Sequence, residues 1–277
     1  MSRIASVGSF ALVVVREATD QYVKYPAAAI AYYGFVSVVP LLLLVIAVAG
    51  TVLGQDVLAG LDEFTPQYLT PDARELVGEA VVAASGRTGA VALAIGVIGW
   101  SGANVAIAFL DTIERVENAD ERSVLGQLRD AAVVLGSLGL AALATVTTSL
   151  VVAVLSIVPL GPFSPAAALY APLVLFVLLT LAFLPLYYVP SRVVTTTLGA
   201  IPGAATAAAG WTLLQIGVQF YAANAGQYAL YGVLSGIIVV LTALYVAAIA
   251  LTLGAVVNAT LSGVGEVGEF SIDPSTR

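Results

Sequence analysis

Four long runs without a single Asp, Glu, Lys or Arg constrain the fold of this chain more than any other feature. They hold 31, 23, 61 and 73 residues and cover positions 25–55, 88–110, 131–191 and 193–265. One membrane-crossing helix needs about 20 apolar residues. The first two runs therefore have room for one such helix each, and the last two have room for a helical hairpin each.

Both of the longer runs are interrupted near their midpoint. The first contains "VPLGPFSPAA" (158–167), with three prolines and a glycine, and the second contains the polar "AANAGQYALYG" (222–232). Proline and glycine clusters end helices, and irregular backbone beside lipid belongs at the water interface. The sequence thus predicts an all-α membrane protein with six transmembrane helices. They are expected at about 27–53, 89–111, 131–157, 166–188, 198–221 and 231–258.

The segments outside these spans are predicted to be short. Apolar residues at helical spacing indicate amphipathic helices at 4–22 and, in the first external loop, at 71–85. The loop 111–130 mixes three arginines with six acids, which is typical of solvated helix ends and lacks the basic field that nucleic acid requires. We expect one membrane domain over 1–265 and a flexible cytoplasmic tail over 266–277.

The distribution of basic residues predicts the orientation. With a cytoplasmic N-terminus, eight of the ten lie inside and only Arg74 and Arg87 lie outside. The positive-inside rule then favours a multi-pass protein of the cell (plasma) membrane with both termini in the cytoplasm. The estimated pI of 4.4 fits a high-salt (halophilic) organism, and it fits equally well a GC-rich genome with an ordinary acidic surface.

Several kinds of chemistry have no support in the composition. There is no cysteine and no histidine, which removes disulfides, the usual zinc ligands and His-based acid–base catalysis. Paired carboxylates, a Ser–His pair and a phosphate-binding loop are also missing. We therefore expect no enzyme activity, no catalytic residue, no metal and no cofactor.

Uncharged polar residues inside the spans are the candidate site. Gln215 and Gln219 follow Trp211 at i+4 and i+8, so the two amides share a face that would be costly against lipid. Asn104 and Asp111 share a face at i and i+7. Such residues either line a polar path or only pack helices together, and the sequence leaves both readings open. The predicted path or inner-face cluster is Tyr33, Ser37, Asn104, Asp111, Gln215, Gln219 and Tyr245.

The first span carries an unusual number of residues that weaken a helix or need a hydrogen bond. Tyr33 and Ser37 share a face, with Gly34 beside it. Pro40 removes a backbone donor and frees the carbonyl near Val36, which must find a partner in lipid. The segment is predicted to be kinked and to face protein.

Two glycine pairs have the small-xxx-small spacing of close helix contacts. One is Gly199 with Gly203 in the fifth span. The other is Gly232 with Gly236 in the sixth. Both pairs are interpreted as packing positions.

Four segments together carry a family resemblance. They are "AAAIAYYGFVSVVPLLLL", "FLDTIERVEN" ending at Asn118, "LPLYYVPSR", and 220–259 with its Tyr-Gly pair and closing Leu-Gly-x-x-x-Asn. Over nearly its whole length the chain resembles the YihY/BrkB family of six-span membrane proteins. The structural motif positions, from this resemblance and from the helix-breaking and glycine patterns above, are Gly34, Pro40, Pro190, Gly203, Tyr231, Gly232, Gly254 and Asn258.

The resemblance implies an integral membrane protein linked to envelope integrity, resistance to killing or transport, without an agreed substrate. Some members carry a ribonuclease-BN-like label. A metal-dependent nuclease needs carboxylates or histidines clustered around ions, whereas the acids of this chain are scattered over both predicted sides of the membrane.

Two functional hypotheses follow. The first is a transporter or lipid translocator whose partner is a lipid headgroup or a small neutral solute, because coupled carriers commonly keep a carboxylate inside the membrane and no span here holds a charge at its middle. The alternative is a non-transporting membrane scaffold or envelope-assembly factor. Membrane lipids are the expected partners, nucleic acid is not, and a homo-oligomer is compatible with the sequence.

Overall fold

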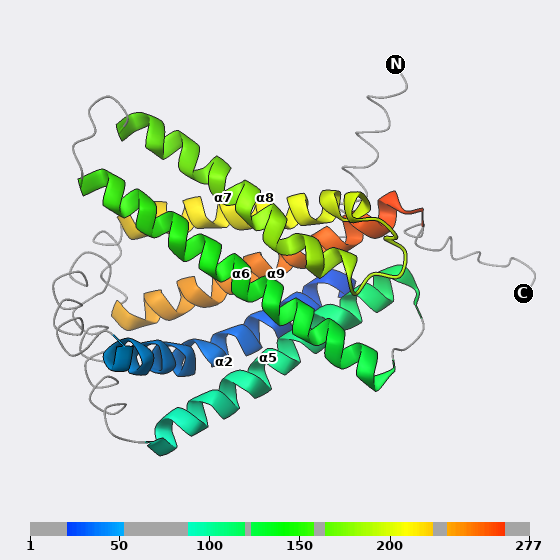
Figure 1. Cartoon of the computed structure of the whole chain (residues 1–277), viewed down its shortest axis with the longest axis horizontal. Helices are drawn as coiled ribbons and strands as arrows, with labels where there is room; N and C mark the ends of the chain where they lie inside the picture. Colours follow the sequence, from blue (N-terminus) through cyan, green and yellow to red (C-terminus); the bar gives the residue numbers. More distant parts are fainter. Residues whose placement is uncertain (1–20, 53–87, 120–122, 158–163, 224–231, 264–277) are drawn as a thin grey trace, which may run out of the picture. The chain divides into compact units, whose positions relative to one another are not determined.

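The computed structural model describes residues 21–52, 88–119, 123–157, 164–223 and 232–263 (Figure 1). All regular secondary structure in these ranges is helical, which confirms the all-α prediction. The helices are α2 (Gln21–Val52), α5 (Thr88–Glu117), α6 (Val124–Ile157), α7 (Ser164–Tyr188), α8 (Thr197–Ala223) and α9 (Gly232–Leu261). The amphipathic helix at 71–85, the tail and Tyr231 lie outside the described residues, as does 4–22 apart from its last two positions, which begin α2.

Five of these helices, α2, α5, α6, α7 and α9, are long and apolar enough to cross a membrane. The exception is α8. It contains no charged residue, but its glycines, proline, threonines and two glutamines keep it below the apolarity of a candidate span. The prediction of several membrane-crossing helices is confirmed, while the sixth span and the orientation stay predictions.

Local hydrogen bonds explain where several helices begin and end. At the end of α5, Asn118 has a φ of 50°, and the Ala119 N–H donates to the Glu114 carbonyl at 3.0 Å. This left-handed turn is a Schellman motif, in which asparagine is one of the few tolerated residues. The hydroxyls of Ser123 and Thr196 accept the N–H groups three residues ahead at the starts of α6 and α8, as N-cap residues do.

The helices form two compact units. The first comprises the start of α2 to Ala27, then Ala108–Thr212, and α9 from Ile249 onward. The second comprises Ala28–Ile107 and Leu213–Ala248. In the first unit α6 packs against α7, so the 61-residue charge-free run does fold as the predicted helical hairpin.

The core of the first unit is formed by one face of each helix. On α7, Leu179, Phe183 and Tyr187 are buried, whereas Leu181 between them and Val177 just before them are exposed. The Tyr187 ring meets Phe109 of α5 edge-on, with 5.9 Å between ring centroids. Exposed apolar side chains on the opposite face of α7 fit contact with lipid tails.

In the second unit, α2 lies against α9 at Gly34. A Cβ at this position would stand 3.6 Å from the Leu244 side chain, an ordinary van der Waals distance. The helix continues through Pro40 to Val52, and the kink predicted there stays a prediction. Gly236 of α9 is exposed, so the predicted packing role does not apply to it in this part of the chain.

In the first unit the backbones of α8 and α9 approach each other closely. A Cβ added at Gly203 would meet the backbone oxygen of Gly254 and lie 2.5 Å from Asn258 Nδ2. A Cβ added at Gly254 would lie 2.6 Å from the Gly203 oxygen. Glycine at both positions therefore lets the two backbones touch, as in other close membrane-helix crossings.

Replacing Gly203 by alanine is expected to destabilise the protein by about 1–3 kcal/mol, because the new methyl group overpacks a backbone contact. The matched control is Gly217→Ala in the same helix, where an added Cβ meets nothing within 4 Å. That change is expected to be neutral or to stabilise by up to about 1 kcal/mol. Thermal unfolding of the purified protein in detergent measures both, and equal midpoints would rule out the close crossing.

Candidate functional site

Six of the seven predicted path residues belong to the second unit. They come from four helices: α2, α5, α8 and α9. They are Tyr33, Ser37, Asn104, Gln215, Gln219 and Tyr245. The seventh, Asp111, is half-buried and belongs to the first unit.

An aromatic contact connects two of the predicted positions. The Tyr33 ring of α2 stands edge-on to Trp100 of α5, with centroids 5.4 Å apart. The Trp100 carbonyl in turn accepts a 2.7 Å hydrogen bond from the Asn104 amide. Tyr33, Trp100 and Asn104 thus form one continuous polar and aromatic cluster within the second unit. Trp100 was not among the predicted residues. Its place near the middle of a predicted span was the sequence signal that could have identified it.

The polar side chains of this unit that have a described hydrogen bond use it within their own helix. Ser37 donates to the Gly34 carbonyl at 2.7 Å, and Asn104 donates to a carbonyl four residues earlier. These bonds satisfy a donor without joining two helices. Gln215 and Tyr245 are half-buried, and Gln219 is exposed.

Within the described ranges, three buried hydroxyl oxygens have no hydrogen-bond partner. They belong to Ser101, Thr148 and Thr212. Threonines elsewhere in these helices, such as Thr180, donate to the carbonyl four residues back. A buried hydroxyl that is left unpaired costs about 1–3 kcal/mol, so Ser101 and Thr212 mark places where water or a polar ligand group would be stabilising.

The first unit contains polar contacts of a different kind, which join helices. Asn258 of α9 is buried, and its Oδ1 accepts the Gly203 N–H of α8 at 2.7 Å. Its Nδ2 donates to the Ala200 carbonyl at 3.5 Å. The Tyr187 hydroxyl of α7 donates to the Leu251 carbonyl of α9 at 2.7 Å. Asn258 and Tyr187 therefore hold α8 and α7 against the same partner helix.

A buried carboxylate at the end of α5 anchors the turn between α7 and α8. Glu117 is 8% exposed. Its two oxygens accept the Ser191 hydroxyl and, at 2.8 Å, the Arg192 N–H. The Ser191 oxygen also accepts the Val194 N–H at 3.0 Å. Hydrogen bonds to a charged acceptor are about twice as strong as neutral ones, so this arrangement fixes the turn against α5.

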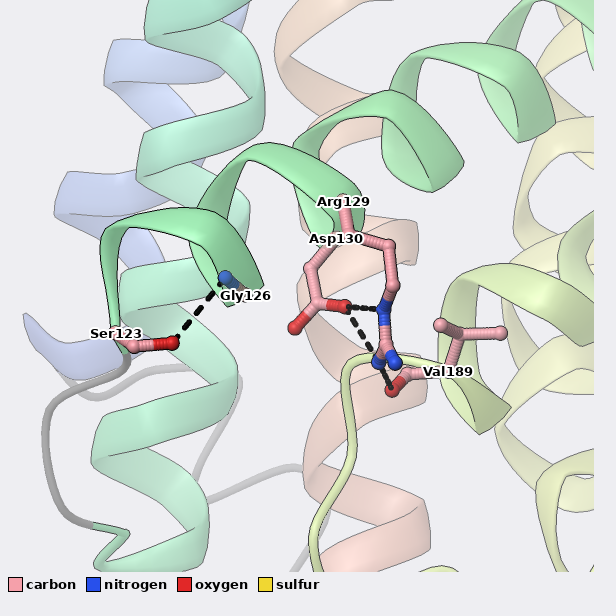
Figure 2. A network of polar contacts seen from close by, with 5 residues as sticks. All are labelled: Ser123, Gly126, Arg129, Asp130 and Val189. Atoms are coloured by element: carbon pink, nitrogen blue, oxygen red, sulfur yellow. Dashed lines mark hydrogen bonds and ion pairs between the residues drawn. The ribbon is translucent and has the colours of Figure 1, made fainter.

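The same turn is bound from α6 (Figure 2). Arg129 reaches from the first turns of α6, and its Nη2 donates to the Val189 carbonyl at 3.4 Å. Its guanidinium also pairs with Asp130, at 2.9 Å between Nη2 and Oδ1. The Asp130 side chain is 6% exposed and that of Arg129 is 66% exposed. The ends of α5, α6 and α7 thus meet at the segment 189–192.

These contacts correct the interpretation of the loop 111–130 as solvated helix ends. Glu117 and Asp130 are buried. Glu117 accepts a hydroxyl and a backbone N–H that lie 74 and 75 residues further along the chain. Asp130 accepts from the adjacent Arg129, which also donates to the Val189 carbonyl. Of the structural motif positions, Gly203, Gly254 and Asn258 come together at one crossing, and Pro190 is buried in the anchored turn.

Comparison with known proteins agrees with this architecture. A model of the family described as "Virulence factor BrkB" matches residues 14–276. The chain belongs to the BrkB virulence factor family. The resemblance stated from the sequence is thereby confirmed, and the molecule is a membrane protein of that family. No curated protein and no solved structure matches this BrkB-family chain.

Replacing Asn258 by alanine in this BrkB-family chain is expected to destabilise it by about 1–3 kcal/mol, because two backbone groups of α8 lose their partner. Asn104→Ala is the control, since its hydrogen bond stays within one helix and is partly exposed. Its expected cost is about 0.5 kcal/mol or less. Thermal unfolding in detergent compares the two, and an Asn258 variant as stable as the control would contradict the interhelical role.

Replacing Glu117 by glutamine is expected to release the 189–194 turn, because an amide NH₂ faces either the Arg192 N–H or the Ser191 hydroxyl. Trypsin cleavage after Arg192 should then accelerate by about tenfold, the equivalent of about 1.4 kcal/mol in local opening. Asp111→Asn, six residues earlier in the same helix, is the matched control. Equal cleavage rates in both variants would show that the carboxylate does not anchor the turn.

Proposed function

We propose that this protein is a transporter or lipid translocator of the cell membrane, with both termini in the cytoplasm. The observation that carries the proposal is the character of α8. It is the one described helix that falls short of the apolarity of a candidate span, yet it holds no charge. A helix of this kind suits a polar, uncharged path better than contact with lipid on all sides.

The polar groups of the second unit support the same role. Ser37 and Asn104 donate hydrogen bonds within their own helices, so these two bonds do not join one helix of that unit to another. The Ser101 hydroxyl of this unit is buried without a partner. A path lined in this way favours a lipid headgroup or a small neutral solute moving down its gradient, since coupled carriers commonly keep a carboxylate inside the membrane.

A second candidate function is a membrane scaffold without transport or catalysis. The hydrogen bonds of Asn258 and Tyr187 favour it, because both are interhelical contacts that make a rigid bundle. They lie in the first unit, whereas the predicted path residues other than Asp111 lie in the second. The two functions therefore predict different sensitive positions.

The double variant Gln215→Leu with Gln219→Leu is expected to lower lipid exchange between leaflets of reconstituted vesicles by at least about tenfold, through loss of the polar lining of α8. The control is Leu213→Ala with Ile216→Ala, which alters exposed apolar positions of the same helix. Labelled phosphatidylglycerol and phosphatidylcholine are the probes. Exchange in the double glutamine variant at the wild-type rate would refute the path, and no exchange by the wild type with any headgroup would favour the scaffold.

A further inference from the structure

At the 189–192 turn the acidic side chains are buried and the arginine side chains are exposed. Glu117 and Asp130 are buried and already accept hydrogen bonds from the protein. Arg129 and Arg192 are exposed. The whole chain has a net charge of −7. At this turn the Arg129 guanidinium pairs through Nε and Nη2 with the buried Asp130 and no described bond uses its Nη1, while the Arg192 side chain is exposed.

The two arginines lie within reach of one small anion. The Arg129 Nη2 is 3.4 Å from the Val189 carbonyl oxygen, and Arg192 follows Val189 by three positions. Three residues span at most about 10 Å even when fully extended. At this separation the Arg192 guanidinium can bind a phosphate in a bidentate manner. The Arg129 Nη1 can donate to the same phosphate, since its Nε and Nη2 already pair with Asp130 and Val189.

Exposed apolar side chains surround Arg129. In the first turns of α6, Val124 is 83% exposed, Leu125 is 79% exposed and Leu128 is 68% exposed. Tyr188, at the end of α7, is 40% exposed. Large apolar side chains next to an exposed arginine at the end of a membrane-crossing helix are typical of the bilayer interface, where the stems contact acyl chains and the charge stays at headgroup depth.

We propose that Arg129 and Arg192 bind the phosphate of an anionic phospholipid, with Val124, Leu125 and Leu128 against its acyl chains. The apolar surroundings favour a lipid phosphate over free phosphate, because inorganic phosphate gains nothing from them. The site uses residues of the first unit only, and it is independent of the path proposed along α8. It would hold a bound lipid in a scaffold as well as in a translocator.

Thermal unfolding of the full chain in a neutral detergent tests this site. Short-chain phosphatidylglycerol is the probe, short-chain phosphatidylcholine is the neutral comparison, and inorganic phosphate at equal concentration is the third arm. A ligand that binds only the folded state stabilises it by RT ln(1 + L/Kd), where L is the free ligand concentration, so the unfolding temperature rises progressively with ligand concentration. We expect phosphatidylglycerol to raise it in this way, and the other two to leave it unchanged.

Arg192→Gln is the main variant, because its side chain is exposed and its backbone N–H keeps the bond to Glu117. The apparent affinity for phosphatidylglycerol should fall by about fivefold, and by about twentyfold or more when Arg129→Gln is added. Lys24→Gln removes an exposed basic residue elsewhere in the first unit and should bind as the wild type does. Unchanged affinity in the Arg192 variant would overturn the proposal, and so would equal stabilisation by phosphatidylcholine or by inorganic phosphate.

Discussion

Hydrophobic burial cannot decide which faces of these helices meet, because lipid tails are as apolar as the leucine and valine side chains that they would replace. Polar contacts and close backbone approach must make that choice. Asn258 does so in the first unit, since it binds both an N–H and a carbonyl of α8. Glycine at positions 203 and 254 allows the approach that these bonds require. Asn258 and the close approach at the two glycines together place α8 against α9.

At the anchored turn 189–194 a charged side chain, and not an amide, decides which helix ends meet. A buried carboxylate is unfavourable unless it is well hydrogen-bonded, and Glu117 has a hydroxyl and a backbone N–H in the turn as donors. Arg129 adds a contact from α6 to the same turn. Three helix ends are thereby connected through main-chain groups, so the side chain of Arg192 is left to face outward. The carboxylates are thus used inside the protein while the arginine side chains stay exposed, so a chain of net negative charge can present a basic surface here.

The positions of the helices were largely predictable from the charge-free runs, although α5 continues past Asp111 to Glu117 and α6 begins at Val124, before Arg129. The fourth span was expected at 166–188, and α7 runs from Ser164 to Tyr188. The burial of Glu117 was not predictable, since a backbone N–H 75 residues away has no signature in the sequence. The contact between Tyr33 and Trp100 was not predictable either, because the two residues lie on different helices and no sequence spacing relates them. Asn118 and Asn258 could be singled out only by resemblance, and the structure supplies their physical reasons: a left-handed turn and an interhelical bond.

The bond between Gly203 and Asn258 joins residues 55 positions apart, which has a consequence for biosynthesis. Membrane helices enter the bilayer in the order of their synthesis, and α8 is the described helix that falls short of the apolarity of a candidate span. Its partner amide is still inside the ribosome or its exit tunnel when α8 first emerges. During that interval α8 lacks the Asn258 side chain as its hydrogen-bond partner. Among the described helices α9 is made last, so the contact that holds α8 against α9 can form only after α8 has left the ribosome.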